Sequence, residues 1–166
     1  MTTTSSEFTE FVHQTGTQLY RTALLLTGDH HLAEDLTQTT YAKVYASWRR
    51  VSRADNPVGY ARTILLNTFL SHRRLRRNGE QPTETLPDHG ASEADPSIRI
   101  DLLAALARLS PTDRAVLVAR YWEDRSISET AAALRLSEPA VRTRSKRALE
   151  RLRPHLLDSF PERNLR

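Results

Sequence analysis

The fold of this chain is decided by residues 126–153, which read SISETAAALRLSEPAVRTRSKRALERLR. Ser126 and Glu129 form the S-x-x-E pattern that caps the N-terminus of a helix, and the residues after them extend this helix to Leu134. The turn RLS follows, and Ser137 is the expected cap of the next helix. The stretch therefore predicts two short helices around a tight turn.

The second of these helices is strongly basic. Between residues 142 and 153 it carries six arginines and lysines against one acid, Glu150. In a helix-turn-helix the second helix lies in the DNA major groove, where arginine can bind the O6 and N7 atoms of guanine. Arg144 and Arg151 are better placed for phosphates. Helical spacing predicts that the inward positions are Val141, Ser145, Ala148, Leu149 and Leu152, and that the outward ones include Glu138, Arg142, Thr143, Lys146 and Arg147.

The composition excludes several classes of protein. The chain has 166 residues, which allows one domain or two small ones. It contains no cysteine, so disulfides, thiol catalysis and thiolate zinc sites are excluded. No apolar run approaches the roughly 20 residues that span a bilayer, and the N-terminus lacks the features of a signal peptide. We therefore expect a cytoplasmic protein without a membrane association.

The net charge of +4 is unevenly distributed along the chain. Residues 1–77 carry ten basic and six acidic residues, a balance of +4, and residues 98–166 carry fourteen and nine, a balance of +5. Residues 78–97 have five acids and no lysine or arginine, a balance of −5. Two basic blocks suggest a polyanionic partner such as DNA.

The acidic segment has the composition of a linker. Residues 78–96 hold three prolines, two glycines and one large apolar residue, Leu86, so the segment cannot bury enough apolar surface to offset its ordering entropy. Both sides of it show helical periodicity. We predict an all-α fold of two small helical domains, an N-terminal block (1–77) and a C-terminal block (98–166), joined by a flexible acidic linker (78–97).

Local signals place the helix ends in both blocks. Gly28 is expected to end a helix that begins near residue 7, and Asp29 to cap the helix at 30–48. A loop at 51–59 contains Asn56 and Pro57, the pattern of a cap followed by proline at the first helical position, before a helix to residue 77. In the C-terminal block, Ser110 is the expected cap of a helix that runs on to residue 123.

No arrangement of residues persuades us of catalysis. His30 and His31 are adjacent and would point in different directions on a helix, and neither a nucleophile elbow nor a glycine-rich phosphate loop is present. We expect no enzymatic activity, no catalytic residues, no cofactor and no metal site.

Two further surfaces remain open to more than one interpretation. The basic end of the helix at 58–77 follows aromatic and amide residues, a combination that suits unpaired bases but also suits a charged helix end. Asp35 and Gln38 share one exposed strip with Glu34, which is either an ordinary solvated face or a protein docking surface.

The amino-acid sequences of several segments resemble those of a known protein family. AEDLTQTTYAKVYASW is similar to region 2.2 of the bacterial sigma-70 factors, and SRADNPVGYARTILLNTFLSHRRLRR is similar to regions 2.3 and 2.4. RLSPTDRAVLVARYWEDRSISETAAALRLSEPAVRTRSKRALERLR resembles region 4. The order, the linker and the short length resemble the extracytoplasmic-function (ECF, group 4) sigma factors, and in particular their SigE-like subfamily.

The resemblance implies roles for particular residues. The N-terminal block would be the sigma region 2 bundle and the C-terminal block the region 4 helix-turn-helix. Core RNA polymerase would be the partner, through its β′ clamp helices and β flap, together with promoter DNA. Since the linker would let the blocks close around a wedged protein, an anti-sigma factor is sterically reasonable. The residues that the resemblance assigns to polymerase binding are Glu34, Asp35, Leu36 and Gln38. Those that it assigns to the −10 element are Ser52, Arg53, Ala54, Asp55, Asn56, Tyr60, Arg62, Asn67, His72 and Arg73. Those that it assigns to the −35 element are Arg142, Thr143, Arg144, Lys146 and Arg147.

The resemblance thus favours a sigma factor that recognises duplex −35 DNA and melted −10 DNA. The alternative is a one-component helix-turn-helix regulator that binds duplex DNA alone, as a dimer on a palindrome. A nucleic-acid enzyme is a further rival, which would need clustered carboxylates or metal ligands. Two departures from the family stand out: Arg135 replaces a common glycine in the turn, where a left-handed backbone would strain it, and Pro139 replaces a common glycine near the start of the second helix.

Overall fold

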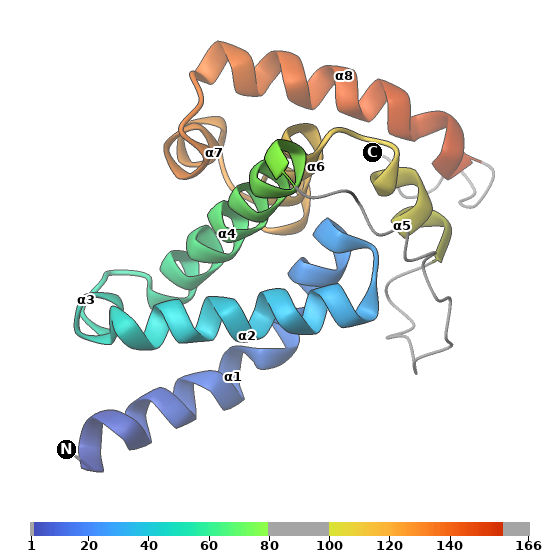
Figure 1. Ribbon diagram of the computed structural model, residues 1–166. Helices are drawn as coiled ribbons and strands as arrows, with labels where there is room; N and C mark the ends of the chain where they lie inside the picture. Colours follow the sequence, from blue (N-terminus) through green and yellow to red (C-terminus); the bar gives the residue numbers. More distant parts are fainter. Residues whose placement is uncertain (1, 80–99, 158–166) are drawn as a thin grey trace.

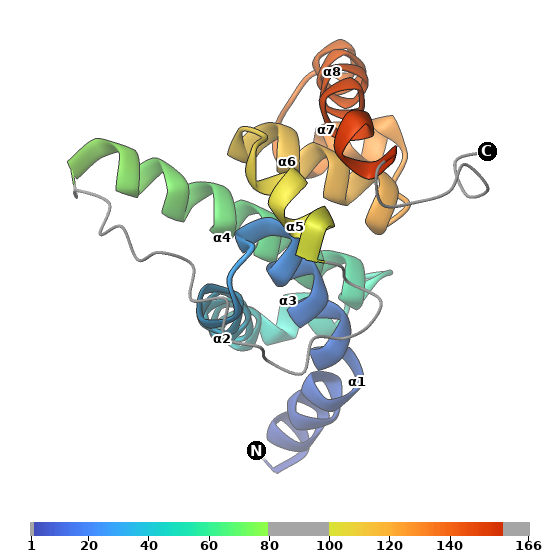
Figure 2. The ribbon, with the colours of Figure 1, turned by 90° about the vertical axis from the view of Figure 1, so that its right-hand side faces the viewer.

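The computed structural model describes residues 2–79 and 100–157, and within these ranges all regular structure is helical (Figures 1 and 2). The all-α prediction is thereby confirmed. The predicted linker lies outside the described residues from position 80 onward, and α4 runs through its first two positions. The elements are α1 (Thr2–Thr27), α2 (His30–Ala46), α3 (Trp48–Ser52), α4 (Pro57–Gly79), α5 (Ile100–Ala107), α6 (Pro111–Leu117), the π-helix η1 (Val118–Trp122), α7 (Ile127–Leu134) and α8 (Glu138–Leu157).

The predicted caps of the N-terminal block form. Gly28 ends α1 with φ at +70°, in the left-handed region that favours glycine, and its N–H bonds the carbonyl of Leu24 at 2.8 Å. The Asp29 carboxylate accepts from the N–H of Leu32 at 2.9 Å and so caps α2. Asn56 caps α4 by accepting from the N–H of Gly59 at 3.0 Å.

The predicted caps of the C-terminal block form as well. The hydroxyls of Ser110, Ser126 and Ser137 each accept from the backbone N–H three residues later, at 3.2, 3.0 and 3.2 Å. Each bond satisfies one of the N–H groups that a helix start leaves without an intrahelical partner. The helix-turn-helix of α7 and α8 therefore begins where the serines predict.

The N-terminal block is a bundle in which α2 packs against α1 and α4. Its core is apolar and fully buried at Leu19, Leu26, Val44, Leu65 and Leu66. The sequence predicted a loop from residue 51, whereas residues 48–52 form α3 because Trp48 and Val51 are both buried. Burial of these two side chains stabilises the helical turn, and the two arginines between them are compatible with it because arginine has a high helix propensity.

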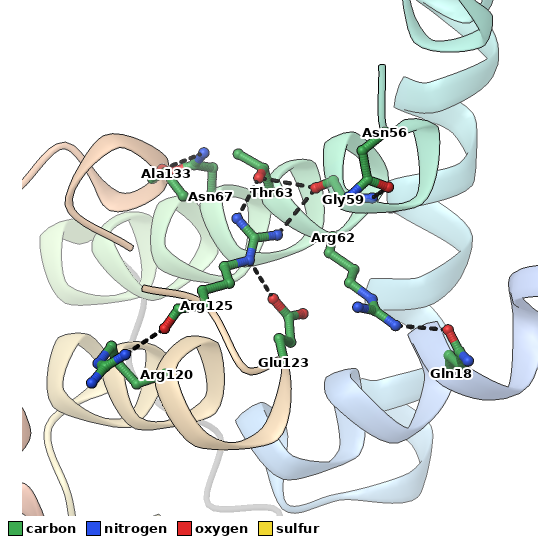
Figure 3. A network of polar contacts seen from close by, with 10 residues as sticks. All are labelled: Gln18, Asn56, Gly59, Arg62, Thr63, Asn67, Arg120, Glu123, Arg125 and Ala133. Carbon is green, nitrogen blue, oxygen red and sulfur yellow. Dashed lines mark hydrogen bonds and ion pairs between the residues drawn. The ribbon is translucent and has the colours of Figure 1, made fainter. Parts of the chain in front are cut away.

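In the C-terminal block, α8 packs on α5, α6 and α7. The helix expected to continue to residue 123 instead widens into η1, where the N–H of Glu123 bonds the carbonyl of Val118 at 3.0 Å. The N–H of Arg125 then bonds the carbonyl of Ala119 at 3.0 Å. This wide turn directs the side chains of Glu123 and Arg125 toward α4 (Figure 3).

The two blocks pack directly against each other. Helices α6 and α7 lie against α4, and α5 and η1 lie against α1 (Figures 1 and 2). Arg114 of α6 joins them, since its guanidinium donates to Leu26 O at 2.5 Å and lies 5.8 Å from the ring centroid of Phe69. A sequence that predicts two blocks and a linker does not predict this closed arrangement.

The turn before the recognition helix is left-handed at Arg135, with φ 57° and ψ 43°. The N–H of Leu136 bonds the carbonyl of Ala131 at 3.0 Å, which closes the end of α7. The left-handed backbone that we expected to strain a non-glycine residue is therefore present at Arg135.

We predict that Arg135→Gly raises the free energy of unfolding by about 1 kcal/mol, because glycine adopts this backbone without the cost of a Cβ. Urea unfolding measures the change. Arg151→Gly, which removes an exposed arginine from the interior of α8, should instead lower the free energy by about 1 kcal/mol. Destabilisation by Arg135→Gly would contradict the strain.

Candidate nucleic-acid interface

The first candidate surface is the outer face of α8. Arg142, Thr143, Lys146 and Arg147 are all exposed there, and Arg142 lies 3.8 Å from the Glu138 carboxylate one turn earlier. The structure therefore places these four predicted residues on one free face, in the first half of the helix. A basic face of this kind suits the edges of bases in a major groove.

Arg144 differs from the other predicted −35 residues. Its Nη1 donates to Asp113 Oδ1 at 2.8 Å, and Asp113 lies in the first turn of α6. In this arrangement the Arg144 side chain joins α8 to α6, so it helps to fix the orientation of the exposed face.

The second candidate surface is the segment that joins α3 to α4. Ser52, Arg53, Asp55 and Asn56 are exposed there, and Ala54 is half-buried. The side-chain oxygen of Asn56 caps α4, and a Cβ at Gly59 would lie only 2.7 Å from the Asn56 amide nitrogen. The cap and this glycine together hold the segment close to the first turn of α4.

A groove follows this segment along α4. It has a volume of about 400 Å³, and Tyr60 and Asn67 line it, together with Lys43 of α2. The ammonium of Lys43 donates to the hydroxyl of Thr68 at 3.1 Å. Two of the predicted −10 residues thus share a groove with a lysine that the sequence analysis did not select, although it is one of only two lysines in the chain.

The remaining predicted −10 residues lie apart from the groove lining. Arg62 extends toward α1, where its Nη2 donates to the side-chain oxygen of Gln18 at 2.7 Å (Figure 3). His72 is exposed, and the guanidinium of Arg73 lies 5.8 Å from the ring centroid of Phe69. The structure therefore brings Tyr60 and Asn67 together but does not bring Arg62 to them.

A basic cleft near α3 was also missed by the sequence analysis. It has a volume of about 480 Å³, and its lining includes Arg49, Arg50 and Arg53. Arg49 and Arg50 are exposed, and the run WRRVSR was the signal that could have found them. This cleft extends the positive surface beyond the predicted segment.

The predicted polymerase-binding strip lies on α2. Glu34, Asp35 and Gln38 are exposed, and the Glu34 carboxylate lies 3.1 Å from His30 Nε2. Leu36 is only 4% exposed and belongs to the core, so the structure does not present it beside the three polar residues.

The C-terminal block bonds directly to α4 in the region of the groove (Figure 3). The Asn67 amide donates to Ala133 O at 3.1 Å. Arg125 donates from Nη1 to the Thr63 hydroxyl at 2.9 Å and from Nη2 to Gly59 O at 3.1 Å. Residues from both blocks thus meet on one face of α4.

Glu123 is the buried acid of this contact. Its side chain is 1% exposed, and one carboxylate oxygen accepts from Arg125 Nε at 2.8 Å, while the other has no hydrogen-bond partner. Burial raises the pKa of the Glu123 carboxyl above its ordinary value, although the positive charges of Arg125 and Arg62 oppose this effect. The arginines of the two blocks therefore offset part of the cost of burying this charge.

The described residues were also compared with the requirements of a metal site and of a membrane-spanning helix. None of their histidines and acids gather in a group of three or more that could hold a metal ion. Over the same ranges, no helix combines the length and apolarity that a membrane crossing needs.

We predict that the stability difference between the wild type and Glu123→Gln changes with pH. Because the folded-state pKa of Glu123 is raised, its contribution to stability is fully present below the pKa of an unfolded glutamate, about 4.3, and is lost as the pH rises through the folded value. The free energy of unfolding of the wild type minus that of the variant should therefore fall as the pH rises above the pKa of an unfolded glutamate, and should level off once the pH has passed the raised folded-state pKa. Urea unfolding at several pH values measures it, with exposed Glu150→Gln as the control. A difference that grows with pH would contradict the prediction.

Comparison with known families matches both blocks. The model of sigma-70 region 2 matches residues 11–79, and that of sigma-70 region 4 matches residues 105–154. The RNA polymerase sigma-E factor of Streptomyces coelicolor is 38% identical, over 91% of this chain and 86% of the relative. The ECF RNA polymerase sigma factor SigX of Bacillus subtilis is 30% identical, over 83% of this chain and 77% of the relative.

Solved structures show a similar fold. The sigma factor RpoE from Bartonella quintana, in complex with the anti-sigma factor NepR, matches with a TM-score of 0.69 and 23% identity, over 93% of this chain and 99% of RpoE. CnrH, in complex with the cytosolic domain of CnrY, matches with a TM-score of 0.59 and 20% identity, over 94% of this chain and 91% of the other.

Proposed function

Because the chain belongs to the sigma-70 family of RNA polymerase sigma factors, in its extracytoplasmic-function group, we propose that each block recognises one promoter element during transcription initiation. The observation that carries this proposal is the presence of two separate candidate DNA surfaces, one on each block. The region 2 match covers the groove of α4, and the region 4 match covers the exposed basic face of α8.

The C-terminal block would read the −35 element as duplex DNA. Arg142, Thr143, Lys146 and Arg147 stand on the exposed side of α8 and would face the major groove. Arg144 would act differently, since its bond to Asp113 holds α8 on α6 and thereby orients the four exposed residues.

The N-terminal block would hold the melted −10 strand. Unstacking a base costs a few kcal/mol, which contacts in a protein site must offset. The segment 52–56 and the groove of Tyr60 and Asn67 provide polar and aromatic groups for such a base, and Lys43 adds a positive charge beside them. Arg49, Arg50 and Arg53 would attract the phosphates of the same strand.

The strip of Glu34, Asp35 and Gln38 would bind the β′ clamp helices of core polymerase, and region 4 would contact the β flap. Leu36 would support this strip from beneath, because it is buried. The protein would make no covalent bonds itself, since sigma factors are initiation factors and the polymerase performs the chemistry. It would work where the polymerase is, in the cytoplasm.

An anti-sigma factor is a further proposed partner. RpoE and CnrH, which share the fold, were each solved with a partner protein, and the partner of RpoE is named an anti-sigma factor. A protein that separates α4 from α7 would occupy the same surfaces that the two blocks use to bind each other.

Run-off transcription tests the proposal. The reaction would contain the purified chain, sigma-free core RNA polymerase, and genomic DNA from upstream of the chain's own gene, with duplex binding by the chain alone measured in parallel. Discrete transcripts that require both proteins would support the proposal and map a start site. Tight, specific duplex binding without core, together with no core association, would favour the one-component regulator instead.

We predict that Arg147→Ala weakens recognition of the −35 duplex by about 1–3 kcal/mol and leaves polymerase binding intact, because the side chain is exposed on the recognition face and distant in sequence from the α2 strip. Holoenzyme binding to promoter variants measures the first effect, and co-purification with core measures the second. Exposed Arg153→Ala removes the same charge from the far end of α8 and should change −35 specificity little. Loss of core binding by Arg147→Ala would overturn this assignment.

We predict the reverse pattern for Asp35→Ala combined with Gln38→Ala. Both residues are exposed on the α2 strip, so their loss should weaken the affinity for core at least tenfold without changing promoter preference. Glu10→Ala with Gln14→Ala is the matched control, since it removes an exposed acid and amide that bond to each other on α1. Equal effects of the two pairs would show that the loss of surface charge, rather than the α2 strip, decides the result.

A further inference from the structure

The turn between α7 and α8 holds an arginine whose residue type does not suit its backbone. Among the described residues other than glycine, positive φ angles occur at Asp124, with 55°, and at Arg135, with 57°. Aspartate is one of the residue types that visit this left-handed region readily, whereas arginine is not. Arg135 therefore occupies a conformation that costs it free energy and that glycine would adopt without this cost.

The fold uses the backbone of this turn and not the arginine side chain. The carbonyl of Ala131 accepts from the N–H groups of both Arg135 and Leu136, and the Ser137 hydroxyl caps α8 by accepting from the N–H of Ala140 at 3.2 Å. The Arg135 side chain is exposed, and within residues 2–79 and 100–157 no hydrogen bond or ion pair joins its guanidinium to another residue. No contact inside this part of the chain offsets the cost of placing arginine here.

The turn lies beside the end of α8 that would enter the DNA. In a helix-turn-helix, the N-terminal residues of the second helix contact the edges of the bases, so the turn before them also lies close to the duplex. Three Cα–Cα steps separate Arg135 from Glu138, the first residue of α8, which is a distance of at most about 11 Å. The major groove is about 12 Å wide and has the phosphates of the two strands at its edges. An exposed arginine in this turn is therefore within reach of a backbone phosphate.

The charges near the start of α8 favour such a contact. From residue 135 to residue 141, the charged side chains are Arg135 and Glu138, and the basic residues of α8 itself begin at Arg142, one turn later. Without Arg135, this end of the helix would present only a carboxylate to the negative phosphates of the duplex. Arg135 supplies the positive charge at the end where the recognition face has none of its own.

We propose that Arg135 binds a backbone phosphate at the edge of the −35 element and that this contact offsets the cost of its left-handed backbone. The proposal rests on the assignment of α8 to duplex −35 DNA. Residues held in unfavourable backbone conformations gather at functional sites, and Arg135 has such a conformation without a use in the fold. Because a phosphate contact carries no sequence information, Arg135 adds affinity for the duplex and leaves the choice of bases to the face of α8.

Arg135→Gly in the holoenzyme tests the contact through the salt dependence of binding to the promoter that run-off transcription maps. We expect binding to weaken about threefold to tenfold, by the same factor for every −35 sequence tested, and the slope of log affinity against log salt concentration to become less steep by about 0.9. Arg135→Lys keeps the charge and should retain most of the affinity, and Arg153→Ala, at the far end of α8, should bind as the wild type does. Since Arg135→Gly is expected to stabilise the fold, unfolding does not explain weaker binding.

Neutral phosphates locate the contact. Single methylphosphonates would replace the phosphates around the −35 element one at a time, and each duplex would be bound to wild-type, Arg135→Gly and Arg153→Ala holoenzyme. At one position, the methylphosphonate should weaken binding by the wild type and by Arg153→Ala but have no further effect on Arg135→Gly, which is the non-additivity expected of two groups in contact. Equal losses for the wild type and Arg135→Gly at every position would overturn the proposal.

Two further results would also contradict a phosphate contact. Arg135→Gly holoenzyme that binds as tightly as the wild type would show that the side chain does not touch the DNA, and a loss that differs among −35 sequences would show that it reads bases instead. A duplex with a scrambled −35 element separates this proposal from the proposed function. Wild-type holoenzyme that binds the scrambled duplex equally well would overturn the −35 assignment of α8 itself, whereas a preference for the intact element with unchanged binding by Arg135→Gly would overturn only the role of Arg135.

Discussion

The arrangement of the helices depends on one buried cation, Arg114. The residue is 4% exposed, and its guanidinium donates four hydrogen bonds: to the carbonyls of Leu106 and Ala107 at the end of α5, of Leu109 just after α5, and of Leu26 at the end of α1. The last carbonyls of a helix lack intrahelical partners and carry partial negative charge, so one guanidinium can satisfy several of them at once. Burial, with a smaller contribution from Arg73, lowers the pKa of Arg114 to about 10, and the side chain therefore remains protonated at neutral pH.

Arg114 helps to fix how the two blocks pack together because it contacts both of them. Three of its carbonyl partners belong to its own block, and these contacts would persist if the blocks separated. Only the bond to Leu26 and the approach to Phe69 cross between the blocks. The C-terminal block therefore keeps the end of α5 fixed on α6 in either state, while the contact with α1 and α4 remains separable.

Local signals predicted much of the fold. Gly28, Asp29 and Ser110 mark helix ends because their preferences act within a few residues, and the outer face of α8 followed from helical spacing. The π-helix η1 and the contacts of Arg125 were not predicted, because they depend on the meeting of helices far apart in the sequence.

The candidate site was predicted only in part, for the same reason. Family resemblance selected Tyr60 and Asn67, but Lys43 joins them through the packing of α2 on α4, which spacing along one helix does not reveal. Arg62 was also selected and lies on α4, but its side chain extends toward Gln18 of α1 and does not line the groove.

The central claim is that the two blocks, which pack against each other in the free chain, each recognise one promoter element and must therefore lie far apart in the complex with promoter DNA. The chain has no cysteine, so spin labels at Thr17→Cys in α1 and Glu150→Cys in α8, both exposed, would report the distance between the blocks by electron paramagnetic resonance. The account predicts a single short distance in the free chain and a much longer one in the complex with core polymerase and promoter DNA. The same distance in both states would contradict it.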